Sequence, residues 1–246
     1  MKRKLALFKA LPFGLTCGLI LLSLVRKAFR IPVTFSYSQG AEDLISDHYL
    51  RYQFAMGMNG TFVDVGCNAP VRYSNTFDLY TRGWRGINID ANGALIEECK
   101  RVRKQDISLR AAISDCEYQA TFHKSKDSDL VSTIDEEKLS DWKKSWDFPD
   151  EDSETVITKT LTSILDENLL DGSEIDLLTI DVEGHDFRVL RGLDMSKYRP
   201  KVIIIEIHGL VALEDNEIYK YLIANGYSLK AFAILSAYFV DERRQV

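Results

Sequence analysis

The chain has 246 residues, of which 46% are hydrophobic and 28% are charged, with only 14 Gly and 5 Pro. This composition excludes disordered, collagen-like and low-complexity proteins, and the length suits one domain with a substantial core. The net charge of -6 is divided unevenly: residues 1–41 contain seven basic residues and no acidic residue, so residues 42–246 carry a net charge of -13. A broad basic face for nucleic acid is therefore not expected.

The amino-terminal segment predicts a membrane anchor. Residues 10–25 contain no charge, with four basic residues before them and Arg26, Lys27 and Arg30 after them. A helix of this length spans only about 24 Å, so it crosses the hydrocarbon core only if its flanks extend it. A cleaved leader would end in small residues, whereas this run ends in Val25-Arg26-Lys27. We therefore predict a basic membrane anchor or leader over residues 1–35, with its orientation open, and a folded domain over residues 36–246.

The four cysteines indicate the compartment that the folded domain faces. Cys17, Cys67, Cys99 and Cys116 are widely spaced and form no CxxC pair. Neither a disulfide framework nor a zinc cluster is suggested, which favours the reducing side of the membrane.

After Pro32, short runs rich in Val and Ile alternate with longer amphipathic segments. We predict strands at Thr61–Val65, Gly86–Asp90, Ile107–Ile113, Asp176–Asp181, Lys201–Ile207, Tyr227–Ala233 and Ala237–Asp241. We predict helices at Asn75–Arg82, Ala94–Arg103, Leu161–Leu169, His185–Arg191 and Glu214–Asn225. Runs that are apolar at nearly every position indicate strands buried on both faces. The fold class is therefore α/β, a doubly wound and mostly parallel sheet.

The pattern breaks between Asp115 and Thr160, where the chain becomes strongly polar. We interpret residues 115–160 as an insertion over the sheet edge, part strand at Tyr118–His123 and part mobile loop or lid.

The first motif with chemical meaning ends the first predicted strand. Asp64 and Gly66 lie at the turn, where Gly66 permits close approach of a ligand and Asp64 can accept a hydrogen bond from an ammonium group. The GxGxxG fingerprint is absent, and Asn68 and Pro70 stand where further glycines would admit a pyrophosphate. An ordinary strand-to-helix turn is the alternative.

The second motif is Asp90 at the end of the next strand, 26 residues after Asp64. An acidic residue at this point is placed to bind both hydroxyls of a ribose. The alternative is an Asp that caps the helix beginning near Ala91.

The third motif combines four ionisable groups, Asp181, Glu183, His185 and Asp186, directly after a buried strand. The neighbouring strand adds Glu206 and His208 at the same rim. Crowded carboxylates in a cleft have raised proton affinity, as general acid/base chemistry requires. Two alternatives stay open: helix capping with a surface ion pair, and a metal site formed by Asp181, Glu183, His185 and His208. Because the metal-ligand types lack a specific spacing, no metal is predicted.

Together these segments resemble the FkbM-type methyltransferases, which depend on S-adenosylmethionine. The resemblance rests on the order and combination of six segments over roughly residues 36–240: Ser38-Gln39-Gly40-Ala41-Glu42-Asp43, FVDVGCNAP, Ser74-Asn75-Thr76, Gly83-Trp84-Arg85-Gly86 with INIDAN, IDLLTIDVEGHD, and Arg199-Pro200-Lys201 with IIIEIHG.

The resemblance implies the role of each matching residue. Asp64, Gly66 and Asn68 would line the methionine end of the cofactor, Asp90 the ribose with Asn92 beside it, and Asp181 with Glu183 the junction between methyl donor and acceptor. From the chemistry of the residues, we expect His185 or His208 to take a proton from a hydroxyl nucleophile, assisted by Glu183 or Glu206, while Asp181 orients the donor or the acceptor.

The expected activity is O-methylation of a glycan, a lipid-linked molecule or a small molecule. The alternative is a membrane-tethered binding module on the same fold that has lost catalysis. For Gln39, Glu42 and Asp43, a cap over the cofactor pocket and the start of a solvated amphipathic helix running to about Arg51 are equally compatible with the sequence.

Overall fold

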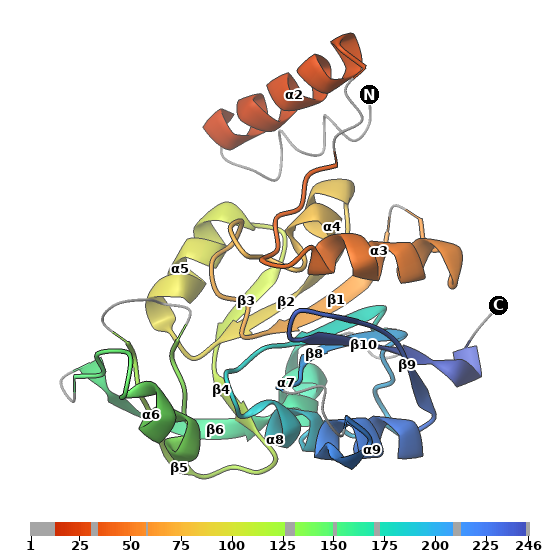
Figure 1. The fold of residues 1–246 in the computed structure, drawn as a ribbon. Helices are drawn as coiled ribbons and strands as arrows, with labels where there is room; N and C mark the ends of the chain where they lie inside the picture. The colour runs from red at the N-terminus through yellow and green to blue at the C-terminus, as the bar shows by residue number, and fades with distance from the viewer. Residues whose placement is uncertain are drawn as a thin grey trace.

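A computed structural model describes residues 13–30, 34–57, 59–125, 131–149, 152–169, 173–208 and 213–244. Its centre is a seven-stranded sheet in the order β3-β2-β1-β7-β8-β10-β9 (Figure 1). The strands are β1 (Thr61–Val65), β2 (Arg85–Asp90), β3 (Ile107–Arg110), β7 (Leu177–Ile180), β8 (Val202–Glu206), β9 (Tyr227–Ala233) and β10 (Ser236–Asp241). The first five pair in parallel, and β10 is antiparallel to both β8 and β9.

Helices cover both faces of this sheet, as the apolar strands predict. One face carries α3 (Glu42–Tyr52), α4 (Phe77–Arg82) and α5 (Gly93–Val102), and the other carries α7 (Leu161–Asn168), α8 (Asp186–Arg191) and α9 (Glu217–Ala224) (Figure 1). Within β1, Phe62 packs in the core beneath α3 and α4, whereas Val63 and Val65 pack in the larger core beneath α7, α8 and α9. This alternation confirms the doubly wound α/β class.

The predicted strand Ile107–Ile113 is two strands. β3 ends at Arg110, Ala111 donates its N–H to the Asp90 carbonyl at 3.0 Å, and β4 (Ala112–Ser114) begins a second sheet. This sheet has the order β4-β6-β5, with β5 at Gln119–Phe122 and β6 at Glu154–Thr160. The chain therefore leaves the main sheet immediately beside Asp90.

The insertion is more regular than the sequence predicts. The strand expected at Tyr118–His123 is confirmed as β5, but β6 and helix α6 (Glu136–Trp142) lie in the segment expected to be loop. Asp135 caps α6, with its side chain accepting the Lys138 N–H at 2.9 Å. Short 3-10 helices, Leu213–Asp215 and Glu242–Arg244, precede α9 and follow β10.

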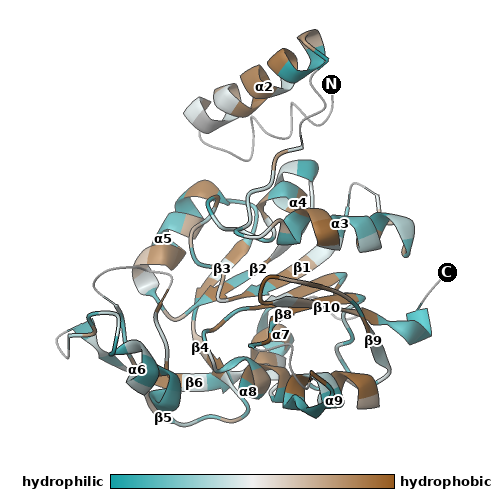
Figure 2. Ribbon diagram, in the orientation of Figure 1, coloured by the Kyte–Doolittle hydropathy of each residue, from teal (hydrophilic) through white to brown (hydrophobic). Residues whose placement is uncertain are grey.

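Helix α2 (Phe13–Ala28) lies at the periphery, beyond α4 and α5 (Figure 1). Several of its large apolar side chains are exposed, among them Phe13, Leu21 and Leu24, and Figure 2 shows the brown apolar residues along it. No helix among the described residues has both the length and the apolar character that crossing a bilayer requires. The transmembrane anchor predicted from residues 10–25 is therefore not supported, and residues 10–12 of that run lie outside the described part.

Candidate functional site

The strand register brings the predicted motifs together at one edge of the main sheet. Val65 pairs with Ile89 on one side and with Ile180 on the other. The next residues along each strand, Gly66, Asp90 and Asp181, must therefore meet at the carboxyl ends of β1, β2 and β7. They line a cavity of about 360 Å³. This is the size range of small-molecule sites, at the sheet edge where ligands of open α/β folds bind.

The turn after β1 is held tightly against its neighbours. Gly66 and Cys67 both donate their N–H groups to the Ile89 carbonyl, at 2.9 and 3.1 Å. Gly66 has a φ of 79°, and a Cβ atom there would lie 1.7 Å from the carbonyl oxygen of Asp181. From the sequence, Gly66 was expected to permit close approach of a ligand. The structure assigns it to the close approach of the backbone at Asp181.

Asp64 lines the cavity and is only 3% exposed. Its Oδ2 accepts a hydrogen bond from the Thr76 hydroxyl at 2.7 Å. Burial raises the pKa of this carboxyl to about 6, although Thr76 and Arg103 oppose the shift. The group is therefore mostly ionised at neutral pH and can bind a cation.

Asp90 organises the loops on the other side of the cavity. Its two carboxylate oxygens accept the N–H groups of Asn68, at 3.0 Å, and of Asn92, at 2.8 Å. The helix cap is Asn92, whose side chain accepts the Ala94 N–H, and not Asp90 as the alternative interpretation held. Asn68 has a φ of 49°, a left-handed conformation that Asn tolerates better than most residues.

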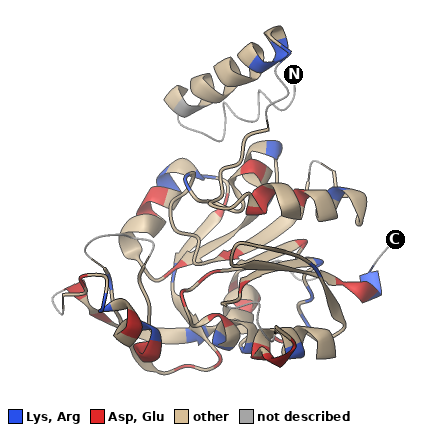
Figure 3. Ribbon diagram, viewed as in Figure 1, with Lys and Arg blue, Asp and Glu red and all other residues tan. Residues whose placement is uncertain are grey.

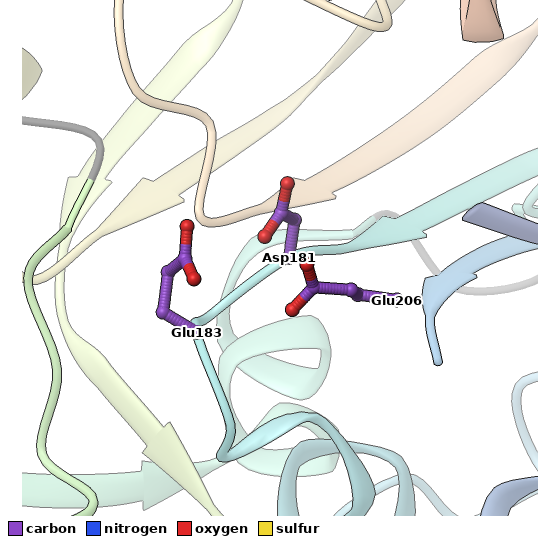
Figure 4. Close-up of side chains that lie close together, drawn as sticks. All are labelled: Asp181, Glu183 and Glu206. Atoms are coloured by element: carbon purple, nitrogen blue, oxygen red, sulfur yellow. The ribbon is translucent and has the colours of Figure 1, made fainter. Parts of the chain in front are cut away.

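Three carboxylates converge at the far end of the cavity. Oxygen atoms of Asp181, Glu183 and Glu206 all lie within 4.8 Å of one another, and Figure 4 shows the three side chains pointing toward a common centre. Burial, followed by mutual repulsion, raises the pKa of Asp181 well above its usual range and that of Glu183 to about 8. At neutral pH the cluster therefore retains protons. Among the described residues this group contains Glu206 rather than the two histidines of the alternative metal site, and its oxygens are ligands that divalent cations accept.

The neighbouring Asp186 has a structural role. Its two oxygens accept the N–H groups of Val182 and Gly184, at 3.1 and 3.0 Å, across the turn after β7. That turn includes Glu183 at a φ of 58° and Gly184 at 98°. This backbone conformation directs the Glu183 side chain toward the cavity, which it lines.

His185 is the histidine that the structure places in the cavity lining, and it is 4% exposed. Its Nε2 shares a hydrogen bond with the Ser114 hydroxyl at 2.9 Å, while Nδ1 has no hydrogen-bond partner and lies 3.9 Å from Asp135. Burial, followed by repulsion from Arg188, lowers the pKa of this imidazole. His185 is therefore neutral at pH 7 and can accept a proton.

His208 and Glu206 do not line this cavity. The His208 side chain is 49% exposed, and its Nε2 lies 2.7 Å from Lys138 Nζ and 2.9 Å from Glu206 Oε2. His208 as a base stays a prediction, and the structure places its side chain outside the cavity lining. Glu206, the last residue of β8, instead contributes its carboxylate to the cluster with Asp181 and Glu183.

The opposite wall of the cavity comes from the motif segments that contain Gln39 and Asn75 and from the insertion. Gln39 and Asn75 contribute from the first face, and the insertion contributes Phe122, residues 131–134 and Trp146. The Thr133 hydroxyl donates to the Glu183 carbonyl at 3.0 Å, which ties the insertion to the turn after β7. The sequence predicted an insertion over the sheet edge, part strand and part loop or lid, but not which of its residues line the cavity. Glu42 and Asp43 begin α3 and bond to residues 36–40.

Residues 64–229 match the family model described as the methyltransferase FkbM domain. This match spans more than half of the chain, so the chain belongs to the FkbM methyltransferase family. Among solved structures, a TehB-like S-adenosylmethionine-dependent methyltransferase from Corynebacterium glutamicum is similar, with 13% sequence identity and a TM-score of 0.39, covering 82% of this chain and 87% of that one. No curated protein matches the chain at a significant level.

The protein is a methyltransferase, and its cofactor is S-adenosylmethionine. The cavity fits this cofactor. The buried Asp64 carboxylate would bind the amino group, the Asp90 carboxylate would bind the ribose hydroxyls, and the apolar side chains of Ile89, Ala111 and Ile113 would contact the base.

Proposed function

We propose that this methyltransferase methylates a hydroxyl oxygen of a polar acceptor, a glycan, a lipid-linked molecule or a small molecule. The observation that supports this proposal is the position of His185. A neutral and buried imidazole lines the same cavity as the residues expected to hold the cofactor. A neutral amine is nucleophilic without losing a proton first. A hydroxyl is a weaker nucleophile, and it benefits from a base within hydrogen-bond reach that removes its proton.

When bound, S-adenosylmethionine supplies an electrophilic methyl group. Asp64 and Asp90 would bind its two polar ends, and the insertion residues that line the cavity would limit the access of water. The His185 imidazole would accept the proton of the acceptor hydroxyl as the methyl group passes from the cofactor sulfur to the hydroxyl oxygen. Nε2 then donates to Ser114, and the nearby Asp135 carboxylate stabilises the imidazolium. Asp181 and Glu183 orient the acceptor by hydrogen bonds.

The acceptor assay uses the purified chain with isotope-labelled cofactor and a cell extract. We expect mass spectrometry to find a product heavier by one methylene unit, with the label on oxygen. His185→Gln should lower kcat by a factor of about 10² to 10⁴ with unchanged cofactor affinity. The matched control is His48→Gln, since His48 is exposed on α3 away from the cavity. Full turnover in His185→Gln would exclude His185 as the general base. Cofactor binding by the wild type without methyl transfer to any acceptor would favour the binding-module alternative.

We also propose that α2 holds the enzyme at a membrane surface. Support comes from its exposed apolar side chains and from Arg26 and Lys27 in its last turn, which Figure 3 shows in blue at one end of the helix. An apolar helix surface with basic residues at its end is typical of segments that bind anionic bilayers. An acceptor with a lipid anchor would then lie close to the cavity.

A further inference from the structure

The cofactor site is connected to a buried cation that the mechanism above does not use. Arg103, the residue that ends α5, is completely buried. Its Nε bonds to Asp106 Oδ2 at 2.8 Å, and its guanidinium lies 5.1 Å from the ring centre of Phe62 and 5.3 Å from that of Tyr80. Burying a guanidinium costs free energy even when it forms an ion pair. Replacing both partners of such a pair by well-packed apolar residues often leaves a protein equally stable or more stable. The position of its remaining donors therefore calls for an explanation.

The second arm of the guanidinium points toward the cofactor side. Nη1 donates to the Thr76 hydroxyl at 2.9 Å and to the Ser74 hydroxyl at 3.3 Å. Arg has donors only, so the Thr76 oxygen must act as an acceptor in this contact. The single hydroxyl hydrogen of Thr76 is thereby left for Asp64, whose Oδ2 lies 2.7 Å away. Arg103 thus fixes the direction of the hydrogen bond that Asp64 receives.

This direction decides which form of Asp64 is stable. An oxygen that receives a hydroxyl hydrogen is an acceptor, and the ionised carboxylate is the better acceptor. The charge of Arg103 acts in the same direction as the Thr76 hydrogen bond, whereas burial and Asp106 favour the protonated form. The other titratable groups that interact with Asp64 are Cys67, on the same turn, and Asp181, at the end of β7. Arg103 is the one cation among these interacting groups.

We infer that Arg103 is a positioning residue for the cofactor: acting through Thr76, it holds the Asp64 carboxylate ionised and oriented toward the amino group of S-adenosylmethionine. This inference rests on the proposed role of Asp64 at the methionine end. Arg103 does not itself line the cavity, so its effect reaches the cofactor through Asp64, both by the Thr76 hydrogen bond and by its charge.

The test measures S-adenosylmethionine binding by calorimetry from pH 5 to pH 7.5, with the full chain. For the wild type we expect affinity to fall as the pH drops through about 6, where Asp64 takes up a proton. In Arg103→Met the midpoint of this loss should shift upward by about one pH unit, which weakens binding about threefold near pH 6.5 and up to about tenfold at pH 5. Arg103→Lys keeps the charge and should restore most of the affinity. Titration of the ligand is common to all variants and cancels in the comparison.

A double-mutant comparison separates this role from a structural one. In an Asp64→Asn background, Arg103→Met should change neither the affinity nor its pH dependence. A uniform loss of affinity at every pH, or an equal loss in the Asp64→Asn background, would overturn the inference. Wild-type affinity in Asp64→Asn alone would instead refute the proposed role of Asp64, so the two failures are distinguishable.

Because Arg103→Met leaves Asp106 buried without its cation, this variant can fail to fold. Thr76→Val keeps the ion pair and removes only the hydroxyl between Arg103 and Asp64. We expect a smaller upward shift of the same midpoint, and Thr76→Ser, which retains a hydroxyl, should reverse it. An unshifted midpoint in Thr76→Val, with Asp64→Asn impaired, would also overturn the inference.

Discussion

At the scale of single residues, the cavity depends on backbone conformations that few side chains permit. Gly66 and Glu183 both have positive φ angles, and they lie on the two turns that follow β1 and β7. A left-handed conformation costs a residue other than Gly about 1–2 kcal/mol, so Glu183 must be held in place by its surroundings. The bonds from Asp186 to both sides of this turn supply that constraint.

Gly66→Ala should be strongly destabilising, by more than about 2 kcal/mol. The new Cβ would meet the Asp181 carbonyl, which belongs to the backbone and cannot rotate away. Thermal denaturation measures the effect, at about 2–4 °C per kcal/mol for a domain of this size. The matched control is Gly18→Ala, where a Cβ has nothing within 4 Å. A Gly66→Ala variant as stable as this control would contradict the packing described here.

At the scale of elements, α2 differs from the other helices in what its apolar residues contact. Helices on the sheet bury theirs in the two cores, whereas Leu21 is 62% exposed and Phe29, just after the helix, is 73% exposed. Such a surface is stabilised when another apolar phase covers it.

We expect the wild type to sediment with vesicles that contain phosphatidylserine, and Leu21→Ser/Leu24→Ser to stay in solution. The double substitution removes apolar area that would enter the membrane, while Arg26→Gln should weaken binding by about 1 kcal/mol through lost attraction to the anionic surface. Ile223→Ser, at an exposed position on α9, serves as the control. Equal sedimentation of all these variants would exclude α2 as the contact.

The sequence predicted elements well where apolar periodicity was strong. β1, β8 and β9 were predicted within a residue or two because their burial follows from the residues themselves. β6 was not predicted, since its pattern of partly exposed residues carries little apolar signal and its pairing with β4 and β5 is formed by the fold.

The same division holds for the site. Asp64, Asp90 and Asp181 could be predicted because strand ends converge by topology. The insertion residues that line the cavity and the connection from Arg103 through Thr76 to Asp64 could not be predicted, because they depend on contacts between residues that are far apart in sequence.

At the scale of the whole molecule, the carboxyl groups with raised pKa values around the cavity determine how stability depends on pH. Burial raises the pKa of Asp64 to about 6, of Asp186 to about 7 and of Glu183 to about 8. Groups whose pKa is higher in the folded than in the unfolded state favour folding at low pH, and this contribution is lost as the pH rises through the folded values. The relevant window therefore lies between about pH 4 and pH 8.

The cofactor-free protein should melt at a lower temperature at pH 8 than at pH 5.5, by at least a few degrees. Glu183→Gln removes one of the charges that must form in this window, so it should reduce the difference. Glu137→Gln, at an exposed position on α6, should leave it unchanged. Calorimetric melting at the two pH values checks both variants, and a rise in melting temperature toward pH 8 would contradict the raised pKa values of these carboxyl groups.

At Ala111 the chain passes from the main sheet to the second sheet, and the residues on either side can change independently in evolution. The main sheet carries the carboxylates assigned to the cofactor, while the second sheet and the segments around it form the facing wall. Mutations between Phe122 and Trp146 can thus remodel the room offered to an incoming molecule while donor recognition is inherited intact. A swap of this stretch between paralogues would move selectivity without rebuilding the enzyme.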